Sequence, residues 1–170
     1  TITSTAPTTF YTGIENINVV LDPAASDHFA VDGTLGNDQF RVTSGPSIGQ
    51  MHIDGTMNQG GVGAAFELPS ISVTGQSNAL IGTFNFNGVG GTDSFKVTGT
   101  DRNDTFNFSR ATATSGSISH LVDGVQTNFI GFANLTTVTV DSLTGDDTFN
   151  VPGDFPFATN INAGDPSASD

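Results

Sequence analysis

The chain has no cysteine, no tryptophan, one tyrosine, and only four basic residues among its 170. Without cysteine it forms no disulfide, so the sequence leaves the redox compartment open. Its 17 acidic residues give a formal net charge of −13. Such a chain cannot neutralise phosphates, which argues against nucleic acid as a partner. No apolar run is long enough to cross a bilayer, so no membrane insertion is expected.

Glutamate is almost missing as well, since fifteen of the 17 acidic residues are aspartate and only Glu15 and Glu67 are glutamate. Aspartate favours turns because its side chain bonds to nearby backbone groups. The chain also has 21 Gly and 14 Phe, with many Thr and Val. This composition predicts short β-strands joined by Asp, Asn and Gly turns.

One phrase occurs twice at a constant offset of 66. Residues 27–44 read DHFAVDGTLGNDQFRVTS, residues 93–110 read DSFKVTGTDRNDTFNFSR, and the two match at eight positions. In each copy a glycine-containing turn leads into an alternating strand, where Phe40 and Val42 share one face. The phrase therefore predicts a loop followed by a strand with a buried face.

Similar strand patterns recur along the chain, many of them about 11 residues apart. Near-identical strand–turn phrases favour a parallel β-solenoid, in which equivalent positions stack and have the same surroundings. A β-sandwich, which predicts antiparallel hairpins, is the alternative. We therefore predict an all-β, parallel β-solenoid fold. The expected strands are 28–31, 39–42, 51–53, 71–73, 83–86, 94–97, 105–108, 117–121, 137–140 and 148–151.

The chain is expected to be a single repetitive segment over residues 1–170. Residues 54–70, DGTMNQGGVGAAFELPS, break the spacing and predict an irregular insert. The final GDPSASD repeats the LDPAASD of residues 21–27, so that Asp170 takes the place of Asp27 at an offset of 143. We expect the chain to be a fragment of a longer array.

The turn before Phe40 resembles the haemolysin-type (RTX) calcium-binding repeat, Gly-Gly-x-Gly-x-Asp-x-large apolar-x. Residues 33–41, GTLGNDQFR, match all but the second glycine, and degenerate copies stand at 99–107, 90–97 and 144–151. The resemblance implies an extracellular parallel β-roll with calcium held between stacked loops by aspartate and backbone carbonyls. It implies Asp38, Asp104, Asp93 and Asp147 as ligands, and Asp27, which opens the repeated phrase, completes the candidate metal set. The alternative is that these aspartates only form turns.

The chain as a whole is similar to the Gly/Asp/Thr/Phe-rich repeat regions of very large bacterial surface proteins, through phrases such as YTGIEN and GDDTFNV. That resemblance implies a structural module, not an enzyme, on the cell surface or outside the cell. Its expected partners are neighbouring repeats or copies of itself, in an adhesin, surface layer or filament. A glycan- or cell-binding module, with the 54–70 stretch as its groove, is one alternative. A fragment of a β-helical polysaccharide lyase or epimerase, using Arg41 or Arg102 beside paired Asp, is the other.

Two weaker patterns point to sites of other kinds. His52 and His120 occupy similar phrases and, if stacked, could bind zinc, although two histidines are weak evidence for a metal site. Residues 45–49, GPSIG, fit a nucleophile elbow around Ser47, but that motif needs a following helix. The sequence predicts a turn there.

Overall fold

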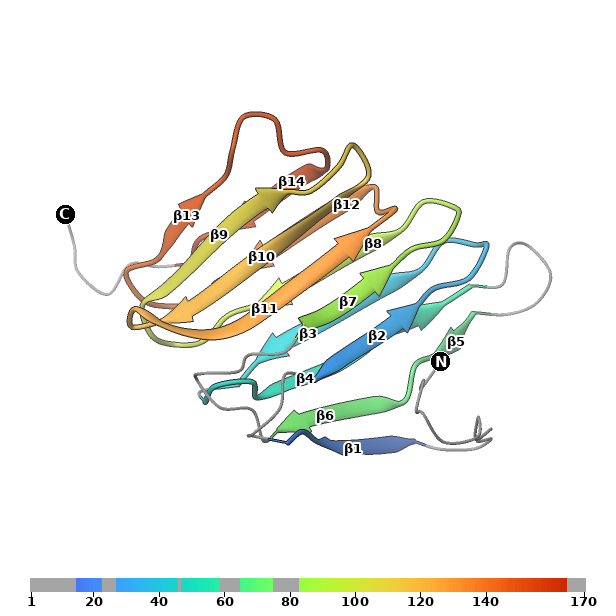
Figure 1. Ribbon diagram of the computed structural model, residues 1–170, viewed down its shortest axis with the longest axis horizontal. Coiled ribbons are helices and arrows are strands. Elements are labelled where there is room, and N and C mark those ends of the chain that lie inside the picture. Colours follow the sequence, from blue (N-terminus) through green and yellow to red (C-terminus); the bar gives the residue numbers. More distant parts are fainter. Residues whose placement is uncertain (1–14, 23–26, 46, 59–64, 75–82, 165–170) are drawn as a thin grey trace.

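A computed structural model describes residues 15–22, 27–45, 47–58, 65–74 and 83–164 (Figure 1). The all-β prediction is confirmed, and all ten expected strands are present. In the described part of the chain, no helix is long and apolar enough to span a membrane. The strands are β1 (Asn16–Val20), β2 (His28–Asp32), β3 (Gln39–Ser44), β4 (Met51–Met57), β5 (Phe66–Glu67), β6 (Ser70–Thr74), β7 (Thr83–Asn87), β8 (Ser94–Thr98), β9 (Asp104–Arg110), β10 (Ser115–Val122), β11 (Val125–Ala133), β12 (Thr137–Asp141), β13 (Thr148–Asn150) and β14 (Ala158–Asn162).

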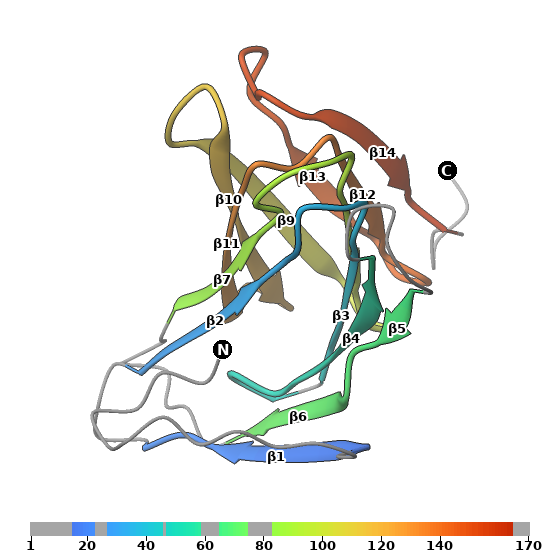
Figure 2. The same ribbon diagram turned by 90° about the vertical axis from the view of Figure 1, so that its right-hand side faces the viewer.

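The strands form two mixed sheets that are not closed. The larger sheet has the order β1-β6-β4-β3-β8-β12-β14, with β5 beside β4, and the smaller has the order β13-β9-β10-β11-β7-β2. Figure 2 shows β2, β7 and β11 facing β3 and β4, with β1 and β6 folding across below them. The arrangement is sandwich-like, with the core between the two sheets.

The chain passes from one sheet to the other through short corners at both ends of the strands (Figure 1). At one end the corners join β2 to β3, β7 to β8 and β11 to β12. At the opposite end they join β8 to β9 and β12 to β13. Corners at the same end of the strands are stacked side by side, because the strands they connect are neighbours in the sheets. Each such level of the stack is called a layer below.

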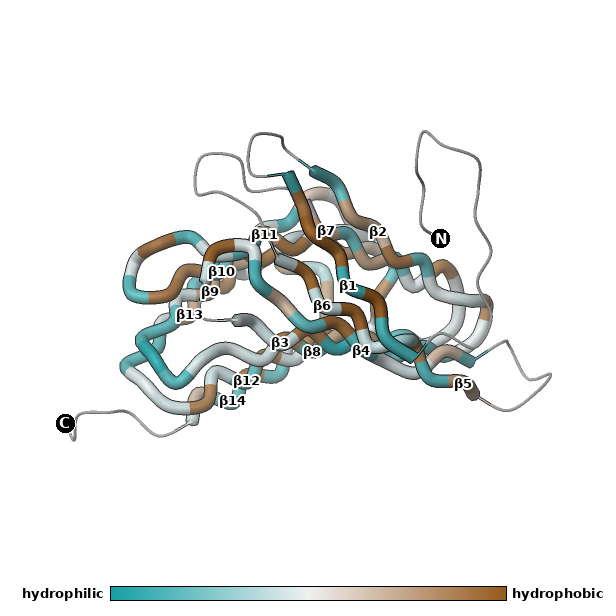
Figure 3. The backbone as a smooth tube through the Cα atoms, turned by 90° about the horizontal axis from the view of Figure 1, so that it is seen from below, coloured by the Kyte–Doolittle hydropathy of each residue, from teal (hydrophilic) through white to brown (hydrophobic). Residues whose placement is uncertain are grey.

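The core is built from alternating residues, as the sequence predicts. β3, β8 and β12 alternate buried and less buried positions, and the alternation of apolar and polar residues is also visible along β1 and β6 (Figure 3). β3, β8 and β12 run parallel and in register with one another. Two inward rows therefore cross the larger sheet, with every member at most 1% exposed: Phe40–Phe95–Val138 and Val42–Val97–Val140.

A purely parallel stack is nevertheless the wrong description of the sheets. β4 pairs antiparallel with both β3 and β6, and β10 pairs antiparallel with both β9 and β11. Two antiparallel excursions thus interrupt the parallel pairing, and the two sheets have the sandwich-like form of the alternative prediction. Each excursion lengthens the chain between stacked strands.

The 66-residue offset is not the stacking offset. The first copy of the repeated phrase forms β2 and β3, which enter the smaller and then the larger sheet. The second copy forms β8 and β9, which enter the sheets in the opposite order. Stacked corners are 55 or 43 residues apart instead.

The 54–70 stretch is more regular than expected. Residues 54–57 complete β4, Phe66–Glu67 form β5, and β6 begins at Ser70. Residues 59–64 of this stretch lie outside the described residues. A groove in this stretch therefore remains a prediction.

Candidate functional site

The five aspartates proposed as metal ligands occupy equivalent positions at corners between strands. Each stands two residues before a phenylalanine, at or immediately before the start of a strand. They precede or begin β2, β3, β8, β9 and β13. The repeated phrase therefore places aspartate where the chain leaves a corner and enters a sheet. The residues are Asp27, Asp38, Asp93, Asp104 and Asp147.

Asp38 closes its own corner with side-chain hydrogen bonds. Its carboxylate is fully buried and accepts the backbone N–H and the hydroxyl of Thr34. It also accepts the N–H of Asn58, at the end of β4, over 2.7 Å. A Cβ at Gly33 would lie 2.5 Å from Asp38 Oδ2. The phrase therefore needs glycine at this position because the carboxylate approaches the backbone closely.

Asp104 repeats the same arrangement at the opposite end of the strands. It accepts the N–H of Thr100 at 2.7 Å and its hydroxyl at 3.1 Å, and a Cβ at Gly99 would lie 2.4 Å from its Oδ2. The additional donor here is His120 Nε2, 2.9 Å from Asp104 Oδ1. Both carboxylates thus carry three hydrogen bonds in a buried site, where each bond to a charged acceptor is strong.

Each of these two corners is also bonded to the corner stacked beside it, through the backbone N–H of its aspartate. The N–H of Asp38 donates to Asp93 Oδ1 at 2.7 Å, and the N–H of Asp104 donates to Asp147 Oδ1 at 2.8 Å. Asn37 and Asn103 accept the N–H of Thr92 and of Asp146, respectively. The structure therefore brings four of the five aspartates together as two stacked pairs.

The second members of the two pairs differ from the first in one respect. Asp93 Oδ2 and Asp147 Oδ2 are buried without a hydrogen-bond partner. The residues at the Thr34 and Thr100 positions are Val89 and Leu143, whose φ angles are 66° and 71°. Their N–H groups make no bond to these oxygens, so each carboxylate keeps one unpaired oxygen.

Asp27 stands apart from both pairs. It accepts the N–H of Asp22 over 2.8 Å in the corner before β2. β2 is the edge strand of the smaller sheet at the end away from β13. Asp27 therefore accepts a backbone N–H from earlier in the chain, as Asp38 and Asp104 do, but it is not stacked against the other four.

The stacked carboxylates fit a turn-forming role better than a calcium cage. Calcium takes six to eight oxygen ligands, whereas the oxygens of Asp38 and Asp104 already accept N–H and O–H donors. Over the described ranges, no group of three or more His, Asp or Glu side chains could hold a metal ion. Calcium binding stays a prediction of the RTX resemblance, and a melting experiment tests it.

We expect the thermal midpoint of the protein to be the same in about 1 mM calcium and in about 1 mM magnesium. At matched ionic strength all samples screen the charge of −13 equally, so a rise common to both ions reports non-specific binding of divalent cations and not a calcium site. Circular dichroism melts with calcium, magnesium and chelator at matched ionic strength measure this. A rise specific to calcium that disappears in Asp93→Asn would establish a calcium site.

The buried carboxyl of Asp93 makes stability depend on pH. Burial raises its pKa, the hydrogen bond from Asp38 N–H lowers it, and the charge of Asp38 raises it, with a net rise above 3.8. The folded protein therefore keeps a proton that the unfolded chain has released. Its contribution to the free energy of unfolding falls as pH rises from about 3.8 through the folded pKa.

We expect Asp93→Asn to remove this dependence, because asparagine does not titrate and its oxygen still accepts the N–H of Asp38. The stability of the variant relative to the wild type should then rise with pH from about pH 4 up to the folded pKa of Asp93 and be constant above it. Urea denaturation between about pH 4 and pH 7 measures the difference, with the exposed Asp101→Asn as control. A constant difference would contradict the assignment.

The surroundings of His120 were not predicted from the sequence. It is fully buried, stacks on Phe106 with ring centroids 4.5 Å apart, and bonds Asp104 on one side and Thr127 on the other. His52 lies in the other sheet, within 3.5 Å of Asp54. The two histidines are therefore not stacked, and the zinc interpretation is wrong for them.

The arginines proposed for a lyase are engaged elsewhere. Arg41 pairs with Asp54 and Arg102 pairs with Asp123, both at the surface. Neither ion pair includes a corner aspartate. Ser47 lies in the turn between β3 and β4, as predicted, where its carbonyl accepts the N–H of Gln50.

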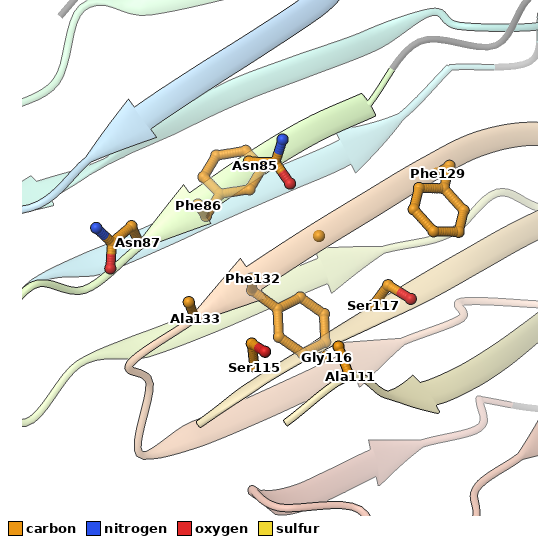
Figure 4. A pocket seen from close by; sticks show the side chains of 11 residues that line it. Asn85, Phe86, Asn87, Ala111, Ser115, Gly116, Ser117, Phe129, Phe132 and Ala133 are labelled. Carbon is orange, nitrogen blue, oxygen red and sulfur yellow. The ribbon is translucent and has the colours of Figure 1, made fainter. Parts of the chain in front are cut away.

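A separate feature is a trough of about 350 Å³ on the smaller sheet, among β7, β10 and β11 (Figure 4). Gly131 leaves its floor without a side chain, next to Asn85 on β7 and Ser117 on β10. Asn85 is exposed and Phe129 is half-buried. The trough thus presents one aromatic ring together with amide and hydroxyl groups.

No protein-family model, curated protein or solved structure matches the chain.

Proposed function

We propose that this protein is a structural repeat module of a secreted or cell-surface bacterial protein, and not an enzyme. In this proposal the parallel-paired strands and their corners act as a β-solenoid that two antiparallel excursions interrupt. Such a module transmits load and spacing along an adhesin, surface layer or filament. Its partners are neighbouring repeats or further copies of the same unit.

The observation that carries the proposal is the corner built twice with the same hydrogen bonds. Asp38 and Asp104 each bond the Thr four residues earlier and stack on a second aspartate in the next layer. The most distinctive residues of the sequence, the repeated Asp and Thr, therefore join one layer to the next. Equivalent positions that stack layer on layer are the hallmark of repeat proteins.

Surface labelling of intact cells that naturally express the protein tests its location. An antibody against the folded chain should label unpermeabilised cells or the medium, and protease added outside should remove the label. A cytoplasmic protein from the same cells serves as the lysis control. Labelling only after permeabilisation would overturn the proposal.

The trough supports a second candidate function, a glycan-binding adhesive module. Sugars bind sites that combine an aromatic face with amide and hydroxyl groups, and Phe129, Asn85 and Ser117 provide that combination. Glycan-array binding followed by titration of any hit tests this function.

If a glycan binds in the trough, Phe129→Ala should weaken its binding about fivefold, since an aromatic contact contributes on the order of 1 kcal/mol. The matched control is Val125→Ala, because Val125 lies on the same strand, is 45% exposed, and does not line the trough. Equal affinity of both variants would remove the trough from consideration.

A further inference from the structure

The two edges of the larger sheet carry the same short sequence. β1 contains Asn16-Ile17-Asn18, and β14 contains Asn160-Ile161-Asn162. The likeness continues along the chain, since LDPAASD at 21–27 corresponds to GDPSASD at 164–170. The strands match at an offset of 144, and the following segments match at 143. The same sequence pattern therefore begins with the strand at each edge of the larger sheet.

The two edge strands also run in the same direction. β14, β12, β8 and β3 are mutually parallel, β4 is antiparallel to both β3 and β6, and β1 is parallel to β6. Moving β14 onto the place of β1 is therefore a translation across the sheet without reversal. Repeated translation of one unit generates a linear head-to-tail array.

Their side chains face the same way. Ile17 lies opposite Ile71 of β6, while Ile161 aligns with Val140 in the inward row that includes Val97. Val97 and Val140 are fully buried, but Ile161 is 43% exposed. An inward-facing row of the core thus reaches the edge of the sheet uncovered.

We infer, resting on the proposed function, that β14 has in one copy the place that β1 has in the next. The occupant of the β14 edge is then β6 of a second copy of this unit. Its register follows from the pairing of β1 with β6, with Asn160 beside Ser70, Ile161 beside Ile71, and Asn162 beside Ser72. The larger sheet continues without a break from β12 through β14 to β6 of the next copy.

This pairing satisfies both sides of the contact. β6 receives the same Asn-Ile-Asn sequence that its own β1 supplies, so exchange of one strand for the other preserves these contacts. Ile161 gains Ile71 as an apolar neighbour, which removes exposed apolar surface from water. The unpaired backbone groups of the β14 edge also gain partners.

Cysteine trapping between two full-length chains tests the register. The natural chain has no cysteine, so Asn162→Cys in one chain and Ser72→Cys in the other are its only thiols. Neighbouring strands lie about 4.8 Å apart, which is within the Cα separation that a disulfide spans. Mixing the two chains in a redox buffer and running non-reducing gels should give a mixed dimer. We expect at least about tenfold more of it than from the out-of-register pair Ala158→Cys and Ser72→Cys.

Two further measurements complete the test. Asn18→Cys with Ser72→Cys in one chain should form an internal disulfide that keeps β1 on β6. Chains locked in this way should elute as monomers in size-exclusion chromatography at a concentration where the reduced chains associate, a readout that needs no free thiol. Mixed dimer no more abundant than in the out-of-register control overturns the inference. Trapping of Asn162→Cys with Asn18→Cys in preference to Ser72→Cys also overturns it, because β14 would then lie beside β1 instead of replacing it. Surface labelling is unaffected by either result, so the proposed function fails or stands separately.

Discussion

Replacing Asp104 with alanine is expected to lower the free energy of unfolding by about 4 kcal/mol. The substitution removes the acceptor for the N–H and hydroxyl of Thr100 and for His120 Nε2, all in a site from which water is excluded. Unpaired buried donors cost far more than the net value of the bonds they lose. Urea denaturation of the variant and the wild type at pH 7 measures the loss.

Two matched variants separate the corner from general charge effects. Asp101→Ala removes a carboxylate from the same corner, but Asp101 is exposed, so a change within about 0.5 kcal/mol is expected. Asp104→Asn keeps the shape and one acceptor oxygen, and should fall between the wild type and the alanine variant. If Asp104→Ala cost no more than Asp101→Ala, the hydrogen-bonded corner would not be a stabilising element.

Phe106→Ala is expected to cost roughly 3–5 kcal/mol. Phe106 is fully buried, with the ring of His120 at 4.5 Å on one face and Phe149 at 5.5 Å on the other. Truncation leaves a cavity between two rings that the backbone of β9, β10 and β13 holds apart. The same denaturation experiment measures this loss.

The control for Phe106→Ala is Leu35→Ala, an apolar truncation at a corner tip where the side chain is 78% exposed. Its effect should stay under about 0.5 kcal/mol. If Phe106→Ala lowered the free energy of unfolding by no more than Leu35→Ala does, the inward face of β9 would have been assigned incorrectly. Because Phe106 and Asp104 both contact His120, their effects are not expected to add.

The candidate site was predictable in its residue types but not in its chemistry. The sequence singles out Asp38 and Asp104 because they recur with Gly and Thr at fixed spacing. The Thr residues prove to be their hydrogen-bond partners, and the Gly residues leave room for the carboxylates. Thr34 and Thr100 could have been recognised as partners from the repeat alone. His120 could not, because its position opposite Phe106 depends on how β10 pairs with β9.

The sequence by itself determined the strands, their inward faces and the aspartate at each corner, because alternation and turn chemistry act over a few residues. Four strands, β1, β5, β11 and β14, were missed. In β11 the alternation is interrupted by consecutive buried residues, next to the β-bulge in its pairing with β10. β14 has exposed residues at four of its five positions.

Only the tertiary structure decided which strands pair and in which sheet. The repeated phrase forms the same hydrogen-bonded corner whether it enters the larger sheet, as at Asp38, or the smaller one, as at Asp104. The local hydrogen bonds from Thr34 and Thr100 therefore form in either sheet, and sequence similarity at an offset of 66 does not indicate a stacking partner. The partner is set by the two antiparallel excursions, whose lengths fix the stacking offsets of 55 and 43 residues.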